Sequence, residues 1–132
     1  MSPELVPGKD LTLPTAVHAI DAHPDGKRLF AACFDGSVFE VSVETGERKL
    51  LGKHTSFASG VRYLPKADRV ISAGYDGALL WLNPAETKPL RTVQAHKFWS
   101  WKMRVSPDEQ FIGTVTGRYA PGDIKYTPAA EV

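Results

Sequence analysis

Three residues of the chain have the side chains that hydrolytic enzymes use for nucleophilic catalysis: His54, Ser72 and Asp76. In such a set, the histidine removes the serine proton and the aspartate orients the imidazole ring. The sequence around the serine reads VISAG, which lacks the Gly-x-Ser-x-Gly pattern of a nucleophile held at a sharp turn. No motif for an oxyanion hole accompanies the three residues. The motifs that would complete a hydrolytic site are therefore missing, and we predict no catalytic residue.

A second cluster has the residue types of a metal site. The segment HAIDAH brings His18, Asp21 and His23 close together in sequence, and imidazole and carboxylate groups are common zinc ligands. On an extended strand, side chains point alternately to the two faces, so His18 lies on one face and the other two residues lie on the opposite face. We therefore predict no metal site, and we predict no cofactor.

The segment HKFWSWKMR has side chains that suit binding. Phe98, Trp99 and Trp101 bury a large area when a partner covers them, and tryptophan keeps a polar N–H for hydrogen bonding. Arg118 and Tyr119 follow in the segment GRYAPGD. The predicted partner-binding residues are Phe98, Trp99, Trp101, Lys102, Arg118 and Tyr119. The alternative is that Trp99 and Trp101 pack inside the fold.

The bulk composition is that of one globular domain. The chain has 132 residues, of which 42% are apolar, and 16 basic and 15 acidic residues give a net charge of +1. Nucleic-acid and membrane-surface proteins need a strong positive field, so we expect neither partner. Cys33 is the single cysteine, and its apolar surroundings LFAACF favour a buried position. The sequence shows no signal peptide or transmembrane segment, and we expect a cytoplasmic protein.

These residues recur with an internal repeat. Pro24, Pro65 and Pro107 begin similar turns and are separated by 41 and 42 residues. Each of the first two prolines is followed eleven residues later by an Asp-Gly pair, at positions 35–36 and 76–77. A fixed period of this length is the signature of a repeat architecture, in which each unit stacks on its neighbours.

Within each repeat, the segments are short and have the pattern of β-strands. The segments SVFEVSV and ALLWL are apolar at both parities, so both faces of these strands must be covered by other layers. No sustained helical period is present, and we expect little helix. The apolar residues that alternate before each proline predict a first strand with one face turned inward: Ile20 and Ala22, Val61 and Tyr63, Met103 and Val105.

This pattern resembles the WD-repeat family of β-propellers. The segment DGSVFEVSVETGE is similar to the third strand of a WD-repeat blade and the turn after it, and the resemblance covers about residues 13–126. The Trp-Asp pair that names the family is replaced at positions 41–42 and 82–83. Leu13 stands where the first repeat would have its loop histidine, and Arg118 stands where the third repeat would have its turn aspartate.

The resemblance implies an all-β fold: a partial β-propeller of about three blades, each an antiparallel four-stranded sheet. The repeats are residues 14–53, 54–95 and 96–132, of which the last is truncated unless an N-terminal strand or a partner copy completes it. Residues 1–13 resemble the outer strand of a neighbouring or closing blade. Either copies assemble into a closed ring, for example a six-bladed dimer, or the chain is a slice of a longer propeller.

The resemblance also implies roles for the polar residues. In WD repeats, a loop histidine, a strand serine or threonine and a turn aspartate form a structural hydrogen-bond network, here His54, Ser72 and Asp76. The loop before the first strand and the turn between the second and third strands open on one rim of a propeller. The predicted partner-binding residues of the third repeat therefore share this rim, which we expect to bind a peptide or an acidic segment. The implied turn residues are Asp35, Gly36 and Gly77.

Together these observations predict a non-catalytic protein–protein interaction scaffold that docks a peptide or protein partner on its rim. One alternative is a domain or fragment of a larger propeller-containing enzyme or multidomain protein. Another is a set of purely structural blades of a longer repeat array. The resemblance does not separate these functions, because this family docks many unrelated partners.

Overall fold

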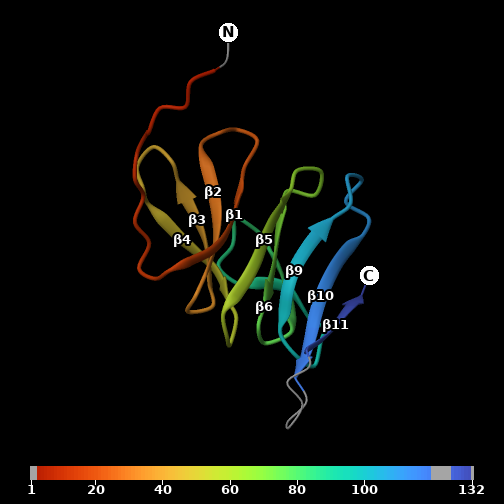
Figure 1. Cartoon of the computed structure of the whole chain (residues 1–132). Coiled ribbons are helices and arrows are strands. Elements are labelled where there is room, and N and C mark those ends of the chain that lie inside the picture. The colour runs from red at the N-terminus through yellow and green to blue at the C-terminus, as the bar shows by residue number, and fades with distance from the viewer. Residues whose placement is uncertain (1–2, 120–125, 132) are drawn as a thin grey trace.

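The computed structural model of the protein describes residues 3–119 and 126–131. Over these residues the chain forms eleven β-strands and no helix, arranged in three antiparallel sheets that we call blades 1, 2 and 3 (Figure 1). Blade 1 has the order β1 (Val17–Ala22), β2 (Arg28–Cys33), β3 (Ser37–Ser42) and β4 (Arg48–Lys53). Blade 2 has the order β5 (Ala58–Leu64), β6 (Arg69–Gly74), β7 (Ala78–Leu82) and β8 (Pro89–Gln94). Blade 3 has the order β9 (Ser100–Val105), β10 (Ile112–Tyr119) and β11 (Tyr126–Glu131).

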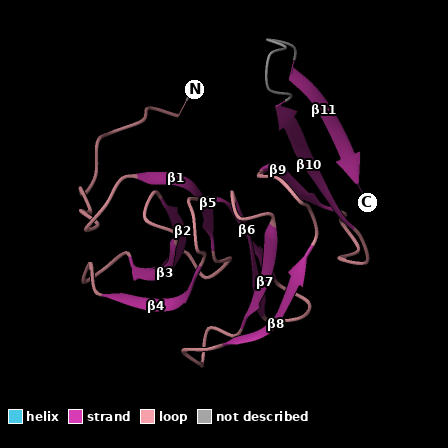
Figure 2. Ribbon diagram, turned by 90° about the horizontal axis from the view of Figure 1, so that it is seen from below, coloured by secondary structure: helices cyan, strands magenta, loops and turns pink. Residues whose placement is uncertain are grey.

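The three blades fan out side by side around one axis. The first strand of each blade lies innermost, and β4 and β8 lie at the outer edges of blades 1 and 2 (Figure 2). Successive strands within each blade are antiparallel neighbours. This arrangement confirms the predicted all-β partial β-propeller, with two four-stranded blades and, within the described part of the chain, three strands in the last blade.

An apolar layer holds blade 1 against blade 2. Val38 pairs with Ala32 across β2 and β3, so both side chains lie on the same face of blade 1. They pack with Phe30 against Val61 and Leu80 of blade 2, and all five side chains are buried. Removing a side chain such as valine, leucine or phenylalanine from water stabilises a fold by roughly 1.5–3 kcal/mol. This layer therefore fixes how the two blades stack.

The other face of blade 2 is also apolar and packs on blade 3. Ile71 and Leu79 form a buried cluster with Met103 of β9. Neighbouring residues of β6 point to opposite faces, so Val70 packs toward blade 1 while Ile71 packs toward blade 3. Because both faces of blade 2 are covered, β6 and β7 have apolar residues at successive positions, pointing to one face and then to the other.

The N-terminal segment covers part of the face of blade 1 that points away from blade 2. Residues 3–16 form no strand, so the outer strand predicted over residues 1–13 is not formed within the described residues of this chain. Its pairing with another blade stays a prediction. Leu11 and Leu13 instead pack on side chains of β2 and β3: Ala31, Cys33, Phe39 and Val41.

One expectation for the first strands is wrong. Ile20 and Ala22 are exposed, and 59% of the surface of Ile20 is accessible. Their side chains lie on the free face of blade 1, because Ile20 pairs with Ala31 and shares its face. Ala19 faces blade 2 instead. In blade 2 the equivalent Val61 is buried, since that face has blade 1 beside it.

The Asp-Gly turns of blades 1 and 2 form hydrogen bonds with the loop that follows each of these blades. Gly36 and Gly77 have φ angles of 92° and 77°, in the left-handed region that favours glycine. The carbonyl oxygen of Gly36 accepts a hydrogen bond from the backbone N–H of His54 at 2.9 Å, and that of Gly77 accepts one from His96 at 3.0 Å. A Cβ at Gly77 would collide with the backbone carbonyl oxygens of His96 and Phe98.

We expect Gly77→Ala to lower the free energy of unfolding by about 2–4 kcal/mol, because it adds a backbone collision to the cost of a left-handed alanine. Gly26→Ala is the matched control, since Gly26 has a φ of 69° and open space around it. The control should lose only about 1 kcal/mol. Urea unfolding measures both variants, and equal losses would contradict the collision.

Candidate functional site

The structure brings His54, Ser72 and Asp76 together from three different elements. His54 follows β4, Ser72 lies within β6, and Asp76 lies in the turn between β6 and β7. The Nε2 atom of His54 is 2.8 Å from the Oγ of Ser72, and its Nδ1 is 3.0 Å from Oδ1 of Asp76. An ionised carboxylate only accepts hydrogen bonds, so the Nδ1–H of His54 donates to Asp76 and Nε2 accepts the proton of the serine hydroxyl.

Electrostatics keep this network as a neutral imidazole beside an ionised carboxylate. Burial lowers the pKa of His54 below its ordinary value of 6.5, although the Asp76 carboxylate acts in the opposite direction. Burial alone would raise the pKa of Asp76. Hydrogen bonds from the backbone N–H groups of Ala78 and Thr55, together with His54, outweigh that effect, and the pKa lies below the ordinary 3.8.

The same geometry does not present a nucleophile to a substrate. Ser72 has no accessible surface, because it lies in the middle strands of blade 2 under the packing of blade 1. His54 is 3% accessible. A general base within hydrogen-bond distance of a serine is one condition for acyl transfer, and access to the serine oxygen is another. Only the first condition is met.

The equivalent positions differ between the three blades. In blade 3, Nε2 of His96 lies 2.6 Å from Oγ1 of Thr114, which replaces Ser72. In blade 1, Leu13 and Ala31 occupy the positions of the histidine and the serine, and they pack together in an apolar cluster. Blade 1 thus replaces a polar network with an apolar contact, and the sequence signal for this is the leucine at position 13.

The predicted turn residue Asp35 keeps a local role. Its Oδ1 accepts the backbone N–H of Ser37 at 2.9 Å, and its Oδ2 accepts the Ser37 hydroxyl at 3.0 Å. The hydrogen bond from the Ser37 N–H lowers the pKa of Asp35 below its usual range. Asp35 therefore stabilises the turn before β3 without a histidine partner.

A row of aromatic rings runs along one rim across all three blades, and we call it the rim ladder. Phe34 lies 4.2 Å from Phe57 between ring centroids, and Phe57 lies 5.4 Å from Tyr75. Tyr75 lies 6.5 Å from Trp99, so the row crosses from blade 1 to blade 3. Figure 2 shows the molecule from the side of this rim. The complete rim ladder comprises His18, Phe34, Phe57, Tyr75, Phe98 and Trp99.

Sequence reasoning found only the blade 3 end of the rim ladder. Its signal in the other blades was the aromatic residue directly before each Asp-Gly pair, Phe34 and Tyr75. Phe57 was a third signal, because it follows His54 in the loop before β5 just as the aromatic pair follows His96 before β9. These loops and turns open on one rim, so the aromatic residues meet there.

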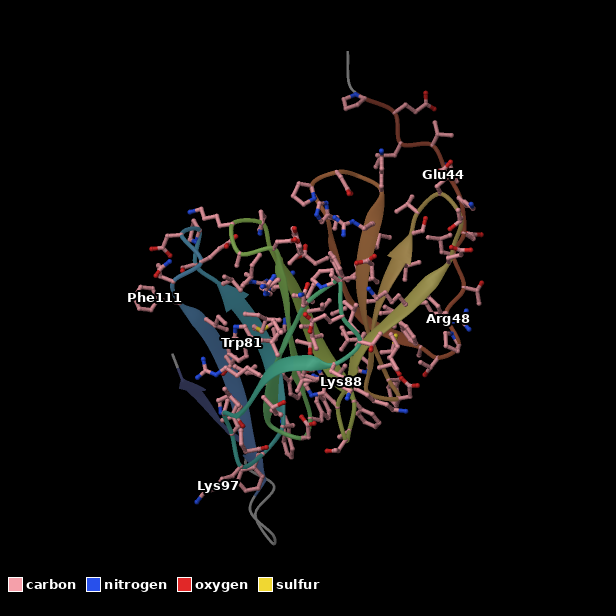
Figure 3. All side chains as sticks on the ribbon, turned by 180° about the vertical axis from the view of Figure 1, so that it is seen from behind. Glu44, Arg48, Trp81, Lys88, Lys97 and Phe111 are labelled. Atoms are coloured by element: carbon pink, nitrogen blue, oxygen red, sulfur yellow. The ribbon has the colours of Figure 1, made fainter. Side chains whose placement is uncertain are left out.

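The predicted partner-binding residues fall into three groups. Phe98 and Trp99 belong to the rim ladder, where Phe98 is 40% accessible and contacts the Trp99 ring at 6.2 Å. Trp101 is 49% accessible and, together with Lys102, lines a cleft next to the rim ladder. Lys97 lies at the same end of blade 3 as the rim (Figure 3). Arg118 and Tyr119 end β10, and their side chains lie outside the described residues.

The cleft that Trp101 lines has a volume of about 390 Å³, and we call it the channel cleft. Its walls come from the innermost strands β1, β5 and β9 and from the turn that holds Tyr75. Arg62, Lys102 and Arg104 supply three cationic groups. His18 and Tyr75 belong both to this cleft and to the rim ladder, so the two surfaces are continuous.

The residues of the HAIDAH segment have separate surroundings. His18 stacks on the rim ladder, whereas Asp21 accepts the backbone N–H of Tyr63 at 2.8 Å. His23 lies 2.9 Å from the Tyr63 hydroxyl, and this contact joins blades 1 and 2. Within the described ranges, no group of three or more histidine, cysteine, aspartate and glutamate residues is placed to hold a metal ion.

The described ranges of the chain contain no helix of the length and apolarity needed to cross a membrane.

A model of a known protein family matches the first part of the chain. The family model described as WD domain, G-beta repeat, matches residues 9–39, which cover the end of the N-terminal segment, β1, β2 and the first half of β3. No curated protein sequence matches the chain. Residues 9–39 are therefore similar to a WD repeat, and the stacked antiparallel blades agree with a propeller built from such repeats.

We expect His54→Ala to lower the free energy of unfolding by about 2–3 kcal/mol, because it leaves the buried Ser72 hydroxyl without a partner and removes the hydrogen bond from His54 to Asp76. His18→Ala is the control at an exposed histidine. Thermal unfolding measures both variants. A melting temperature of His54→Ala equal to that of the wild type would contradict a structural role.

We expect stability to fall as the pH drops below about 6.5, because the unfolded chain protonates His54 there while the folded chain resists protonation. A second fall should begin near pH 3.8, since the pKa of Asp76 is lowered in the folded state and its stabilising effect is lost through protonation. Urea unfolding of the wild type and His54→Asn between pH 7.5 and 5.0 isolates the first effect. Identical pH dependence in the two proteins would contradict it.

Proposed function

We propose that the protein is a non-catalytic scaffold that docks a protein or peptide partner on the rim ladder. The WD-repeat family provides protein-interaction propellers that are generally non-catalytic. The observation that carries the proposal is the continuous aromatic row across three blades, in which Phe34 is 45% accessible and Phe98 is 40% accessible. A partner that covers these rings removes a large apolar area from water.

The rim ladder suits docking because its rings are held in place before a partner arrives. Phe57 and Tyr75 are half-buried and contact rings on both sides. A side chain that is already ordered loses little conformational entropy on binding. At the centre of an interface, a few well-packed side chains supply most of the binding energy and aromatic residues are enriched among them, so a few anchors are enough for a specific contact.

The enzyme alternative has less support. The hydrolytic residue types are present, but Ser72 is fully buried between blades. The network of His54, Ser72 and Asp76 is better explained as a contact that ties the loop after β4 to blade 2.

The free face of blade 1 supports a second contact, with another propeller blade. Ile20 is 59% accessible and Leu50 is 44% accessible on this face, and both pair with residues of its apolar cluster. Exposed apolar sheet faces of this kind promote association. Light scattering tests whether a second copy of the chain supplies the blade that covers this face. A dimeric wild type that becomes monomeric in Ile20→Asp would support a second copy as the partner. A monomeric wild type would contradict it.

Docking on the rim ladder is tested with peptides selected on the wild-type protein from a random dodecapeptide display library. We expect Phe98→Ala to weaken the selected peptides about tenfold, because it removes an anchor worth roughly 1–2 kcal/mol. Phe111→Ala is the matched control, since Phe111 is 63% accessible and lies at the opposite end of blade 3 from Lys97 (Figure 3). Equal affinity of the wild type and Phe98→Ala, with Phe98→Ala less stable, would contradict the proposal.

A further inference from the structure

The channel cleft has a strong local charge in a protein that has almost none overall. Arg62, Lys102 and Arg104 line it, and no aspartate or glutamate is among its described lining residues. The whole chain has 16 basic and 15 acidic residues. The cations therefore gather at this cleft without matching carboxylates.

The ion pairs of the protein lie elsewhere. In the described parts of the chain, Arg28 pairs with Asp25 and Glu40, while Asp25 and Asp76 also lie beside the imidazole rings of His23 and His54. None of them includes a cation of the channel cleft. Arg62, Lys102 and Arg104 all line one cleft, so their positive charges add there and favour an anionic ligand.

The cleft also has aromatic walls. Trp101 is 49% accessible and stands beside Lys102 on β9, and Tyr75 stands on the side of blade 2. A flat ring binds the apolar part of a side chain or a peptide plane, while the cations bind carboxylate groups. The volume of about 390 Å³ accommodates a few residues of an extended chain.

From these features we infer that the channel cleft binds an acidic segment of a partner protein. The carboxylates of the segment pair with Arg62, Lys102 and Arg104, and Trp101 packs on its backbone or apolar side chains. The inference rests on the proposed docking function and names the chemistry of the partner. Because His18 and Tyr75 belong to both surfaces, one partner chain can cross the rim ladder and enter the cleft.

A protein segment fits the cleft better than a nucleic acid does. Nucleic acids bind through many phosphate contacts along an extended basic surface. Here three cations occupy one cleft at the innermost strands, and the net charge of the whole chain is +1. A short run of glutamate or aspartate matches that number of charges.

The test uses fluorescence anisotropy with fluorescein-labelled decapeptides of alternating glutamate and glycine. Matched decapeptides replace every glutamate with glutamine, and a decathymidylate serves as the nucleic-acid probe. We expect the glutamate peptide to bind at least tenfold more tightly than the glutamine peptide, and to weaken as sodium chloride rises from 50 to 300 mM. Arg62→Gln and Lys102→Gln should each weaken it about fivefold.

The controls are Arg48→Gln and Lys88→Gln, which remove exposed cations outside the channel cleft and should leave the affinity unchanged (Figure 3). Lys102 is exposed, so its replacement keeps the test valid where Arg62→Gln lowers stability. No binding of the glutamate peptide at 1 mM, equal affinity for both peptides, or tighter binding of the decathymidylate would overturn the inference. Failure of this test, with selected peptides still sensitive to Phe98→Ala, would leave docking on the rim ladder intact.

Discussion

The structure depends on the burial of sheet faces between neighbouring blades. Phe30 and Val38 of blade 1 pack on Val61 and Leu80 of blade 2, and the opposite face of blade 2 packs on Met103 of blade 3. A sheet that is apolar on both faces is stable in water only when another layer covers each face. Stacking of repeated units around an axis satisfies this requirement, and it also brings the first strand of every blade to the centre.

The candidate binding surfaces follow from that stacking. Because the blades share one orientation, the turns before their third strands and the loops before their first strands open on the same rim. Phe34 of blade 1, Tyr75 of blade 2 and Trp99 of blade 3 therefore meet in one row, although they are far apart in sequence. The first strands bring Arg62 and Lys102 together at the centre in the same way.

The repeat made the fold predictable, and the differences between repeats limited the prediction of the site. The repeat spacing and the strand patterns carried the resemblance to WD repeats, that resemblance implied antiparallel blades, and the described strands agree. The period also predicted that Ile20 behaves like Val61, which is wrong because no described blade covers that face. The aromatic cluster of HKFWSWKMR was visible in sequence, but its separation into rim and cleft depends on the irregular pairing of β9 around Trp101. The contact of Leu13 with Ala31 follows the repeat, because these two residues occupy the positions of His54 and Ser72, but their apolar chemistry replaces the hydrogen bond.

The central claim is that blades 1 and 2 stack through their apolar faces, and a double-mutant cycle across that interface tests it directly. The rings of Phe30 and Tyr63 come from different blades and lie parallel, 5.2 Å apart with an interplanar angle of 8°. Urea unfolding of Phe30→Leu, Tyr63→Leu and the double variant should give a coupling free energy of about 0.5–1.5 kcal/mol. A coupling of zero would mean that the two blades do not pack as described.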